Sequence, residues 1–456
     1  MREFFAAFRA LRTSPAGLWL VVFAFSVDAM AYFGALTLMT EYLHDDLGMS
    51  DAWAGRTISV FTMLVTLCMI GIGGTVEKRG VRKGVLLALG LTLLGRIVYA
   101  GAVGAGSVRF VVVVFGLLVV ALGEGILQPV AYAGIKQFTD ARSSSMGYAM
   151  MYAMMNLAIV VIGAISPAVR VSVDGAHAAG RSPISGIAAV GWTCAGIGLV
   201  CLLVFLVFMT PKQEARAIRP TAEEKDDGPV KPRLTRVKEY FVGTKAAPGP
   251  FRDIRFVFFI FMLLPVRTLF AHQWLTMPAY VLRAYPPAVA DKMEWIVNWI
   301  NPGIIFFGVP TITALTKKYN VYSMMILGTF VSAVPTFLLC LGPRLEILVT
   351  YLVIFSIGEA LWSARFLEYA SELAPEGRVA QYMGLANVPW ILAKFTTGLY
   401  SGWMLARFCP KDGPQHTEVM WLVYGIIAML SPVGLFLARG WVRRGMPDAK
   451  AQVASA

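Results

Sequence analysis

The sequence has few charged residues: Asp, Glu, Lys and Arg make up only 15% of its 456 residues, against a hydrophobic share of 57%. This composition lacks the polar surface that a water-soluble domain needs. Histidine is also scarce, with four residues, and the HExxH, GxSxG and Walker patterns are missing from the sequence. These absences exclude the common hydrolases, zinc peptidases and P-loop nucleotidases. We therefore expect no enzyme, no catalytic residues and no cofactor.

Cysteine is rare and widely spaced. The five residues show neither the pattern of a disulfide framework nor the spacing of a metal site. Since unpaired cysteines are commonly buried as small apolar residues, we interpret all five as packing residues and expect no bound metal. They are Cys68, Cys194, Cys201 and Cys340 in apolar stretches and Cys409 in a loop.

What the sequence does contain is a series of long apolar stretches. A membrane-spanning helix needs ~20 mostly apolar residues, and twelve windows of this kind are present. The sequence therefore predicts an all-α polytopic membrane protein with twelve transmembrane helices. The seventh window is long enough to tilt or break near Pro265 or Pro278. The windows are 17–41, 54–76, 82–104, 108–134, 144–168, 184–209, 251–284, 293–315, 320–342, 345–370, 379–406 and 417–440.

The windows form two sets of six with a polar linker between them. We expect two six-helix bundles, the build of one large class of secondary transporter. The linker contains EEKDDGP, which is the composition of a flexible tether. The predicted parts are an amphipathic segment at 1–16, a first bundle at 17–209, a linker at 210–250, a second bundle at 251–440 and a tail at 441–456.

Basic residues outnumber acidic ones, and the formal net charge is +13. Lys and Arg collect in the loops and termini that are cytoplasmic when the N-terminus lies inside the cell. We therefore predict a multi-pass protein of the inner membrane with both termini cytoplasmic. The charge reflects this topology and contact with lipid headgroups, and no basic domain for nucleic acid is present. We expect a monomer whose partners are membrane lipids, a small-molecule solute and protons.

Seven Asp, Glu, Lys or Arg side chains lie well inside the apolar windows, away from their ends. A charge at the centre of the bilayer costs at least ~2.5–3.5 kcal/mol, so such residues usually face the interior of a helix bundle or a watery cavity. Their presence predicts a path or pocket for a polar solute. They are Asp28, Arg96, Glu124, Arg267, Glu359, Arg365 and Lys394.

Polar and aromatic residues recur on the same helix faces as these charges. Positions i, i+4 and i+8 share a face, as Tyr148, Tyr152 and Asn156 do in the fifth window. Because polar faces need polar neighbours, we predict one central substrate cavity. Its predicted substrate-binding residues are Tyr32, Gln128, Tyr152, Asn156, Arg267, Trp274, Asn298, Asn301, Glu359, Trp362, Trp390 and Lys394.

Each of these residues has a structural alternative. Arg267 or Lys394 can instead neutralise the acids of the first and fourth windows as a buried pair. Structural pairing is the favoured interpretation of Arg96 and Arg365. Aromatic residues also form interfacial belts, and Asn side chains also join neighbouring helices.

The loop between the second and third windows has the sequence GGTVEKRGVRKG. It resembles the loop motif of the major facilitator superfamily, with Glu77 at the usual Asp. The resemblance implies a cytoplasmic gate formed by Glu77, Arg79 and Arg82. A basic loop that only sets the topology is the alternative. The matching residues are Gly73, Glu77, Lys78, Gly80, Arg82 and Lys83.

Further matches occur in both halves of the chain. Gly358-Glu359, Ser363 and the LAP at 373–375 resemble the GEL…S…LAP pattern of the proton-dependent oligopeptide transporter (POT) family. This resemblance implies a peptide-like solute whose ammonium faces Glu359. Other matching residues are Gly123, Gly125, Pro129, Gln137, Phe138, Tyr152, Asn156, Asn301, Pro302, Pro310, Met383 and Gly384.

The chain departs from this family in the first and fourth windows. Aligning the YFG at 32–34 with ExxERFxYYG keeps one acid, Asp28. Phe25 and Ala29 replace the first Glu and the Arg, and Gln128 replaces the Lys of the fourth span. The family uses these groups to hold a peptide carboxylate and to couple proton movement. The resemblance therefore implies a relative with altered substrate chemistry.

Together, the residues and the resemblance predict a secondary active transporter that moves a small zwitterionic or peptide-like solute by alternating access. We expect proton coupling through Asp28, Glu124 and Glu359, because a buried acid beside a mobile cation can change protonation state as helices move. An exporter of amphipathic or cationic compounds and a substrate-sensing receptor on the same fold are the alternatives.

Overall fold

The protein was analysed as a computed structural model, and all its described regular elements are helical. The described residues are 14–69, 80–139, 144–218, 250–316, 319–372, 382, 385–386 and 388–443.

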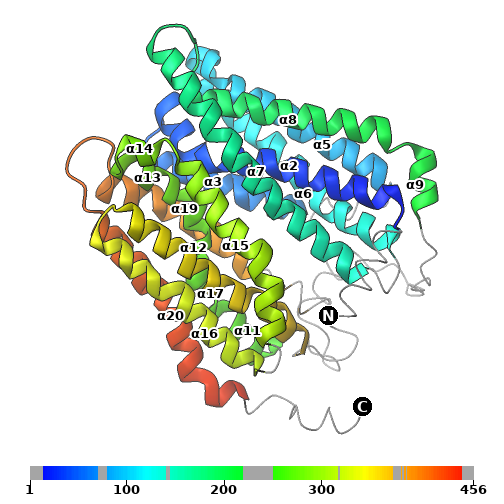
Figure 1. The fold of residues 1–456 in the computed structure, drawn as a ribbon, viewed down its shortest axis with the longest axis vertical. Coiled ribbons are helices and arrows are strands. Elements are labelled where there is room, and N and C mark those ends of the chain that lie inside the picture. Colours follow the sequence, from blue (N-terminus) through cyan, green and yellow to red (C-terminus); the bar gives the residue numbers. More distant parts are fainter. Residues whose placement is uncertain are drawn as a thin grey trace. The chain divides into compact units, whose positions relative to one another are not determined.

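The first half of the chain forms long helices that lie side by side (Figure 1). Each of the first six apolar windows coincides with a helix. The elements are α2 (Ala16–Glu41), the π-helix η1 (Tyr42–Asp46), α3 (Asp51–Cys68), α5 (Val81–Ala100), the 3₁₀ helix η3 (Gly101–Val108), α6 (Arg109–Phe138), α7 (Ser144–Ala178), α8 (Gly186–Phe208) and α9 (Pro211–Ala217).

The second half follows its windows equally well. The expected break in the seventh window is confirmed: α11 ends at Met262, α12 begins at Leu264 and α13 begins at Met277. Pro265 and Pro278 stand in the first turns of α12 and α13, where proline's missing N–H costs no helical hydrogen bond. The elements are η4 (Pro250–Arg252), α11 (Ile254–Met262), α12 (Leu264–Leu275), α13 (Met277–Ala284), α14 (Pro287–Ala290), α15 (Met293–Thr316), α16 (Val321–Ala333), η5 (Val334–Leu341), α17 (Leu345–Glu372), α19 (Val388–Phe408) and α20 (Thr417–Arg443).

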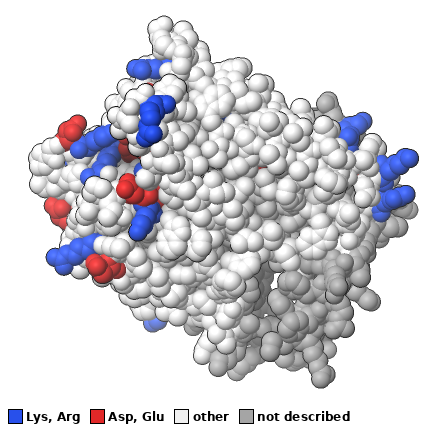
Figure 2. Space-filling model, turned by 45° about the horizontal axis from the view of Figure 1, so that its top comes forward, with Lys and Arg blue, Asp and Glu red and all other residues white. Residues whose placement is uncertain are grey.

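The helices are long and apolar enough for a membrane. By length and composition alone, eight helical segments of the described residues qualify as spans, and one of them, Val81–Phe138, contains both α5 and α6. On the face drawn in Figure 2, charged side chains gather near the edges and leave a broad uncharged surface between them. Such a surface suits contact with lipid.

The helices group into two units by their contacts. The first unit contains Met1–Glu224 together with Gln273–Phe306 and Phe395–Pro414. The second contains Lys225–His272, Phe307–Lys394 and Gln415–Ala456. The first unit therefore includes the ends of several helices of the second half, which pack against helices of the first half.

Glycines bring α5 and α6 into close contact. A Cβ at Gly95 would lie 2.6 Å from the backbone nitrogen of Val120, and one at Gly123 would lie 2.7 Å from that of Thr92. Small residues allow such close helix packing in membranes. This packing sets the positions of Arg96 on α5 and Glu124 on α6.

Candidate functional site

Arg96 lies at the centre of a buried charge cluster in the first unit. Its Nη1 donates to Asp28 Oδ1 on α2 at 2.7 Å, and its Nη2 donates to Glu124 Oε1 on α6 at 2.8 Å. The Thr92 hydroxyl donates to Asp28 Oδ1 at 3.1 Å. The Arg96 and Asp28 side chains are each only 1% exposed. We call Asp28, Arg96 and Glu124 the Arg96 cluster.

The Arg96 cluster has two carboxylates for one guanidinium. Asp28 Oδ2 is buried and has no hydrogen-bond partner among the described residues. The Glu124 side chain keeps 13% of its surface exposed. One bound proton would make the cluster neutral, so the arrangement is suited to taking up and releasing a proton.

These contacts decide between the interpretations of the buried charges. The structural pairing expected for Arg96 is confirmed. The alternative that Arg267 or Lys394 neutralises Asp28 or Glu124 is wrong, because Arg96 holds both carboxylates. Arg96 reaches both acids because α5 packs beside α6, which carries Glu124, and also contacts α2, which carries Asp28.

Arg267 lies in the second unit among aromatic rings. Its Cζ is 4.3 Å from the ring centroid of Phe366, 5.5 Å from that of Trp362 and 5.9 Å from that of Trp390. The residue is only 6% exposed. Cation–π contacts of this kind are worth ~2 kcal/mol or more when water is excluded. In these ring contacts the N–H groups of Arg267 do not donate strong hydrogen bonds.

Lys394 shares one of these rings with Arg267. Its Nζ is 4.9 Å from the centroid of Trp390, one helical turn earlier on α19. Both cations thus lie within 6 Å of the centroid of the Trp390 ring, so they are near each other. We call Arg267, Lys394, Trp362, Phe366 and Trp390 the aromatic cation site.

The aromatic cation site contains hydrogen-bond donors that lack acceptors. Nε of Arg267 and Nε1 of Trp362 are buried and have no partner within the described part of the chain. No carboxylate of the described residues lies within 4 Å of the Arg267 or Lys394 nitrogens. Within the aromatic cation site, the sequence predicted substrate-binding roles for every residue except Phe366.

Ring packing and glycine contacts hold this site in place. The Phe270 ring on α12 lies 5.7 Å from Trp362 and 6.0 Å from Trp390. A Cβ at Gly328 of α16 would lie 2.7 Å from the Trp362 Cβ, so glycine permits this close approach of α16 and α17. Glu359 lies one turn before Trp362 on α17 and is half-buried.

Arg283 at the end of α13 joins the two halves of the sequence within the first unit. Its guanidinium binds Asp51 at 2.7 and 2.8 Å through two nitrogens and binds Glu41 at 2.9 and 3.1 Å. It also donates to the Cys409 carbonyl at 3.3 Å. The three charged side chains are at most 6% exposed. We call Arg283, Glu41 and Asp51 the Arg283 clasp.

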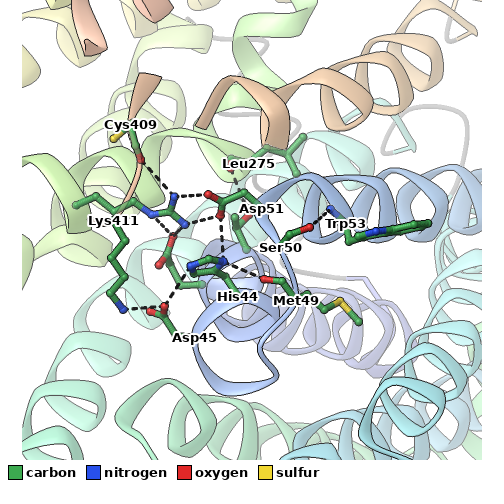
Figure 3. A network of polar contacts seen from close by, with 12 residues as sticks. His44, Asp45, Met49, Ser50, Asp51, Trp53, Leu275, Cys409 and Lys411 are labelled. Atoms are coloured by element: carbon green, nitrogen blue, oxygen red, sulfur yellow. Dashed lines mark hydrogen bonds and ion pairs between the residues drawn. The ribbon is translucent and has the colours of Figure 1, made fainter. Parts of the chain in front are cut away.

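A more exposed shell surrounds the clasp (Figure 3). His44 Nδ1 lies 3.4 Å from Asp51 Oδ1 and 2.9 Å from the Met49 carbonyl. Lys411 binds Asp45 at 2.7 Å, and its side chain is 53% exposed. All of these residues lie in loops or helix ends that the charge distribution assigns to the outer side.

A second buried pair joins α7 to α15. Arg170 binds Glu294 through Nε at 2.6 Å and through Nη2 at 2.8 Å. Its Nη2 also donates to the Ala290 carbonyl at 2.9 Å, and the Glu294 side chain is fully buried. These helix ends also lie on the predicted outer side.

Close backbone contact joins α3 to α19. A Cβ at Gly55 would lie 2.7 Å from the Gly398 carbonyl and 3.0 Å from the Gly402 nitrogen. The Ser59 hydroxyl donates to the Phe395 carbonyl at 2.9 Å. Hence three separate contacts link the two sequence halves at the predicted outer ends of their helices.

The sequence analysis did not identify the Arg283 clasp or the Arg170–Glu294 pair. Glu41 and Glu294 stand at the edges of their windows, and Arg170 lies just past one. A charge at the end of a window lies near the membrane surface and does not by itself indicate a buried pair. A search for opposite charges at window ends of the same membrane side would have found them.

Two predicted substrate residues join helices at these outer ends. Asn298 is buried and exchanges hydrogen bonds of 3.4 Å with Thr37 on α2. Trp274 packs on Phe33 with ring centroids 5.3 Å apart. Asn298 thus joins neighbouring helices, and Trp274 packs against a ring of the first half.

The remaining predicted residues lie on α2, α6, α7 and α15. The Tyr32 ring packs on Phe33 and Phe61, the Gln128 amide donates to the Tyr132 hydroxyl at 3.1 Å, and the Asn156 amide donates to the Tyr152 carbonyl of its own helix at 2.9 Å. Tyr152 is 43% exposed and Asn301 is half-buried.

Of the predicted gate, only Arg82 lies within the described residues; Glu77 and Arg79 lie outside them. Arg82 binds the corner between α8 and α9, where its backbone N–H donates to Glu214 Oε1 at 2.8 Å and its Nε donates to the Met209 carbonyl.

This bundle of apolar helices with charges buried at depth defines a polytopic membrane transport protein. The profile of the Major Facilitator Superfamily matches residues 18–285, more than half of the chain. The chain therefore belongs to the Major Facilitator Superfamily and is a transporter rather than an enzyme. A search of curated protein sequences finds no match.

Solved structures share the fold over nearly the whole chain. A POT family transporter in complex with 5-aminolevulinic acid has a TM-score of 0.72 at 16% identity, covering 94% of this chain and 97% of its own. The peptide transporter POT in complex with sulfate has a TM-score of 0.71 at 18% identity, covering 95% and 96%. A variant of that transporter in complex with alafosfalin has a TM-score of 0.72 at 17% identity, covering 95% of this chain and 96% of its own. The expected twelve-helix fold is confirmed.

Proposed function

We propose that this protein is a secondary active transporter that moves a small, charged solute across the membrane by alternating access, coupled to protons. The observation that carries the proposal is the Arg96 cluster, in which two buried carboxylates share one guanidinium. A buried site of this kind gains or loses one proton without leaving a large charge imbalance. Proton relays in transporters use acids at membrane depth.

The outer contacts support alternating access. The Arg283 clasp, the Arg170–Glu294 pair and the α3–α19 crossing all join helices of the two sequence halves on the predicted outer side. Opening that side would require these contacts to break. We infer that they form and separate once in each transport cycle.

Compounds bound in the structures of the relatives guide the choice of solute. 5-Aminolevulinic acid and alafosfalin each combine an amine with an acidic group. We propose a solute of this small amphoteric class. This chain differs from an ordinary peptide carrier because it lacks the first-span Arg and has Gln128 in place of the fourth-span Lys. The acidic group of the solute would therefore bind elsewhere in the protein.

Uptake by proteoliposomes tests this proposal. Liposomes containing the purified protein are offered alanyl-alanine, 5-aminolevulinic acid and alafosfalin, with and without an inward proton gradient. We expect at least one compound to accumulate above its outside concentration only when the gradient is present. Uptake that stops at equal concentrations would reject coupling, and binding without uptake would indicate a sensing receptor.

A further inference from the structure

We infer that the aromatic cation site binds the acidic group of the solute, a carboxylate or a phosphonate, with an apolar part of the solute against the rings. This inference rests on the proposed transport function and adds the place and charge of one ligand group. It assigns anion binding to α12, α17 and α19 of the second sequence half.

The first reason is that Arg267 differs from three other buried arginines, which pair with carboxylates. Arg96, Arg170 and Arg283 each bind a carboxylate within 3 Å. Arg267 is equally buried but has aromatic rings as its neighbours and no described carboxylate. A buried charge without a counterion is costly unless a ligand supplies one.

The second reason is that the unsatisfied groups are all donors. Nε of Arg267 and Nε1 of Trp362 lack acceptors among the described residues, and the Lys394 ammonium faces a ring. A guanidinium presents its N–H groups in a plane that matches the two oxygens of a carboxylate or phosphonate. An anionic group would therefore satisfy donors that the described protein leaves open.

The third reason is the composition of the walls. Trp362, Phe366 and Trp390 present rings around the cations, and Phe270 packs on both tryptophans. Rings exclude water, which strengthens the attraction between Arg267 and an anion. They also offer apolar contact to the solute's carbon skeleton, so an acid with an apolar body fits better than an inorganic anion.

Thermal unfolding of the purified full-length protein tests this inference with paired probes. Each acid is compared with its neutral form: 5-aminolevulinic acid with its methyl ester, and indole-3-acetate with its amide; sulfate serves as a bare anion. A ligand that binds the folded state raises Tm. We expect at least one organic acid to raise Tm, while its neutral partner does not.

Two variants connect the effect to the site. Arg267→Gln and Lys394→Met should each weaken binding of that acid at least 30-fold, whereas Lys394→Arg should weaken it less than fivefold. Arg439→Gln is the matched control, because Arg439 also lies 4.3 Å from a phenylalanine ring, that of Phe436, but on α20 and outside the site. Binding by this control should equal that of the wild type.

The unliganded variants give a second readout that does not depend on the choice of probe. Arg267→Gln loses its ring contacts but also removes a buried charge that has no described carboxylate, so its Tm should fall less than that of Arg283→Gln, which removes a paired cation. A fall in Tm as large as that of Arg283→Gln would show that Arg267 has a structural role like that of Arg283 and would overturn the inference.

The outcomes separate this inference from the transport proposal. Proton-driven uptake that is unchanged in Arg267→Gln and Lys394→Met would reject the anion site and keep the transporter. Acid binding that these variants abolish, without uptake by the wild type, would keep the site and reject transport. No Tm shift with any acid, or equal shifts with acid and neutral partner, would overturn the inference.

Discussion

At the residue scale, five cations inside the protein fall into two groups by the neighbours that they contact. Arg96, Arg170 and Arg283 are neutralised by carboxylates from other helices. Arg267 and Lys394 instead face aromatic rings. Removing one partner of a buried pair costs ~3–5 kcal/mol because it leaves an isolated charge. Neutralising substitutions should therefore destabilise the protein more in the first group than in the second.

Glu124→Gln tests the proton site. The substitution leaves Asp28 and Arg96 as a neutral pair at 2.7 Å, so we expect folding to be preserved, with a change in stability of ~1 kcal/mol or less. Proton-driven accumulation should fall at least tenfold, while exchange of solute across the membrane without a gradient continues. Uptake assays over pH 5.5–8 check this; accumulation with unchanged pH dependence would contradict the assignment.

Arg96→Gln should behave differently. Both carboxylates would then be buried without a cation, at a cost of ~3–5 kcal/mol unless they bind protons. We expect a lower Tm whose deficit shrinks as the pH falls, because protonation removes the unpaired charges. Scanning fluorimetry at several pH values in detergent measures this effect. A pH-independent deficit would argue that packing, not charge, is the cause.

At the element scale, the predicted outer ends of the helices are joined by contacts of different kinds. The Arg283 clasp is a fork of two carboxylates on one guanidinium, and the α3–α19 crossing relies on the absence of side chains at three glycines. Ionic contacts can break and reform as helices move, whereas the glycine crossing only needs the two backbones to separate. Both suit a region that opens during transport.

Arg283→Gln should weaken this clasp. Glu41 and Asp51 would lose their shared cation, so we expect a loss of ~3–5 kcal/mol and easier opening of the outer side. Lys411→Gln is the control, because its pair with Asp45 is exposed and is worth ~0–1 kcal/mol. Thermal unfolding and labelling of engineered outer cysteines measure the two effects. Equal behaviour of the two variants would contradict a special role for the clasp.

Gly55→Ala tests the helix crossing. The new Cβ would meet the Gly398 carbonyl, and because neither backbone can yield without moving its helix, we expect a loss of ~1–3 kcal/mol and slower uptake. Gly90→Ala on α5 is the matched control, since nothing lies within 4 Å of its added Cβ. The control should be neutral or slightly stabilising, as alanine favours helix more than glycine.

At the scale of the whole molecule, the sequence predicted the elements far better than their partners. Hydropathy located every described long helix, and prolines located the breaks around α12, because both signals act within one segment. Pairing depends on residues far apart: Arg283 and Glu41 are separated by 242 positions. Spacing along a helix therefore indicated which faces are polar, but it did not identify which faces meet.

The same limit applies to the counterions of the predicted cavity residues. The sequence directs Asp28, Glu124, Arg267 and Lys394 toward one cavity because polar helix faces need polar neighbours, but it does not say which charge pairs with which. Arg96, which lies on the helix packed beside both acids, took the role of their counterion. Arg267 and Lys394 of the second half have aromatic rings as neighbours instead. Counting charges in the sequence does not predict this arrangement.

A disulfide across the predicted outer side tests whether the whole molecule alternates. Thr37 on α2 and Asn298 on α15 exchange hydrogen bonds of 3.4 Å, so their side chains face each other. A disulfide needs a Cβ–Cβ distance of ~3.5–4.5 Å, so formation of the bridge is verified by the loss of free thiols on oxidation before uptake is measured. In a background with the five native cysteines replaced by alanine or serine, we expect oxidation of Thr37→Cys/Asn298→Cys to abolish uptake and dithiothreitol to restore it. Each single variant should be insensitive to oxidant. Full uptake by the oxidised double variant would show that these helix ends need not separate, and alternating access through this side would then have to be abandoned.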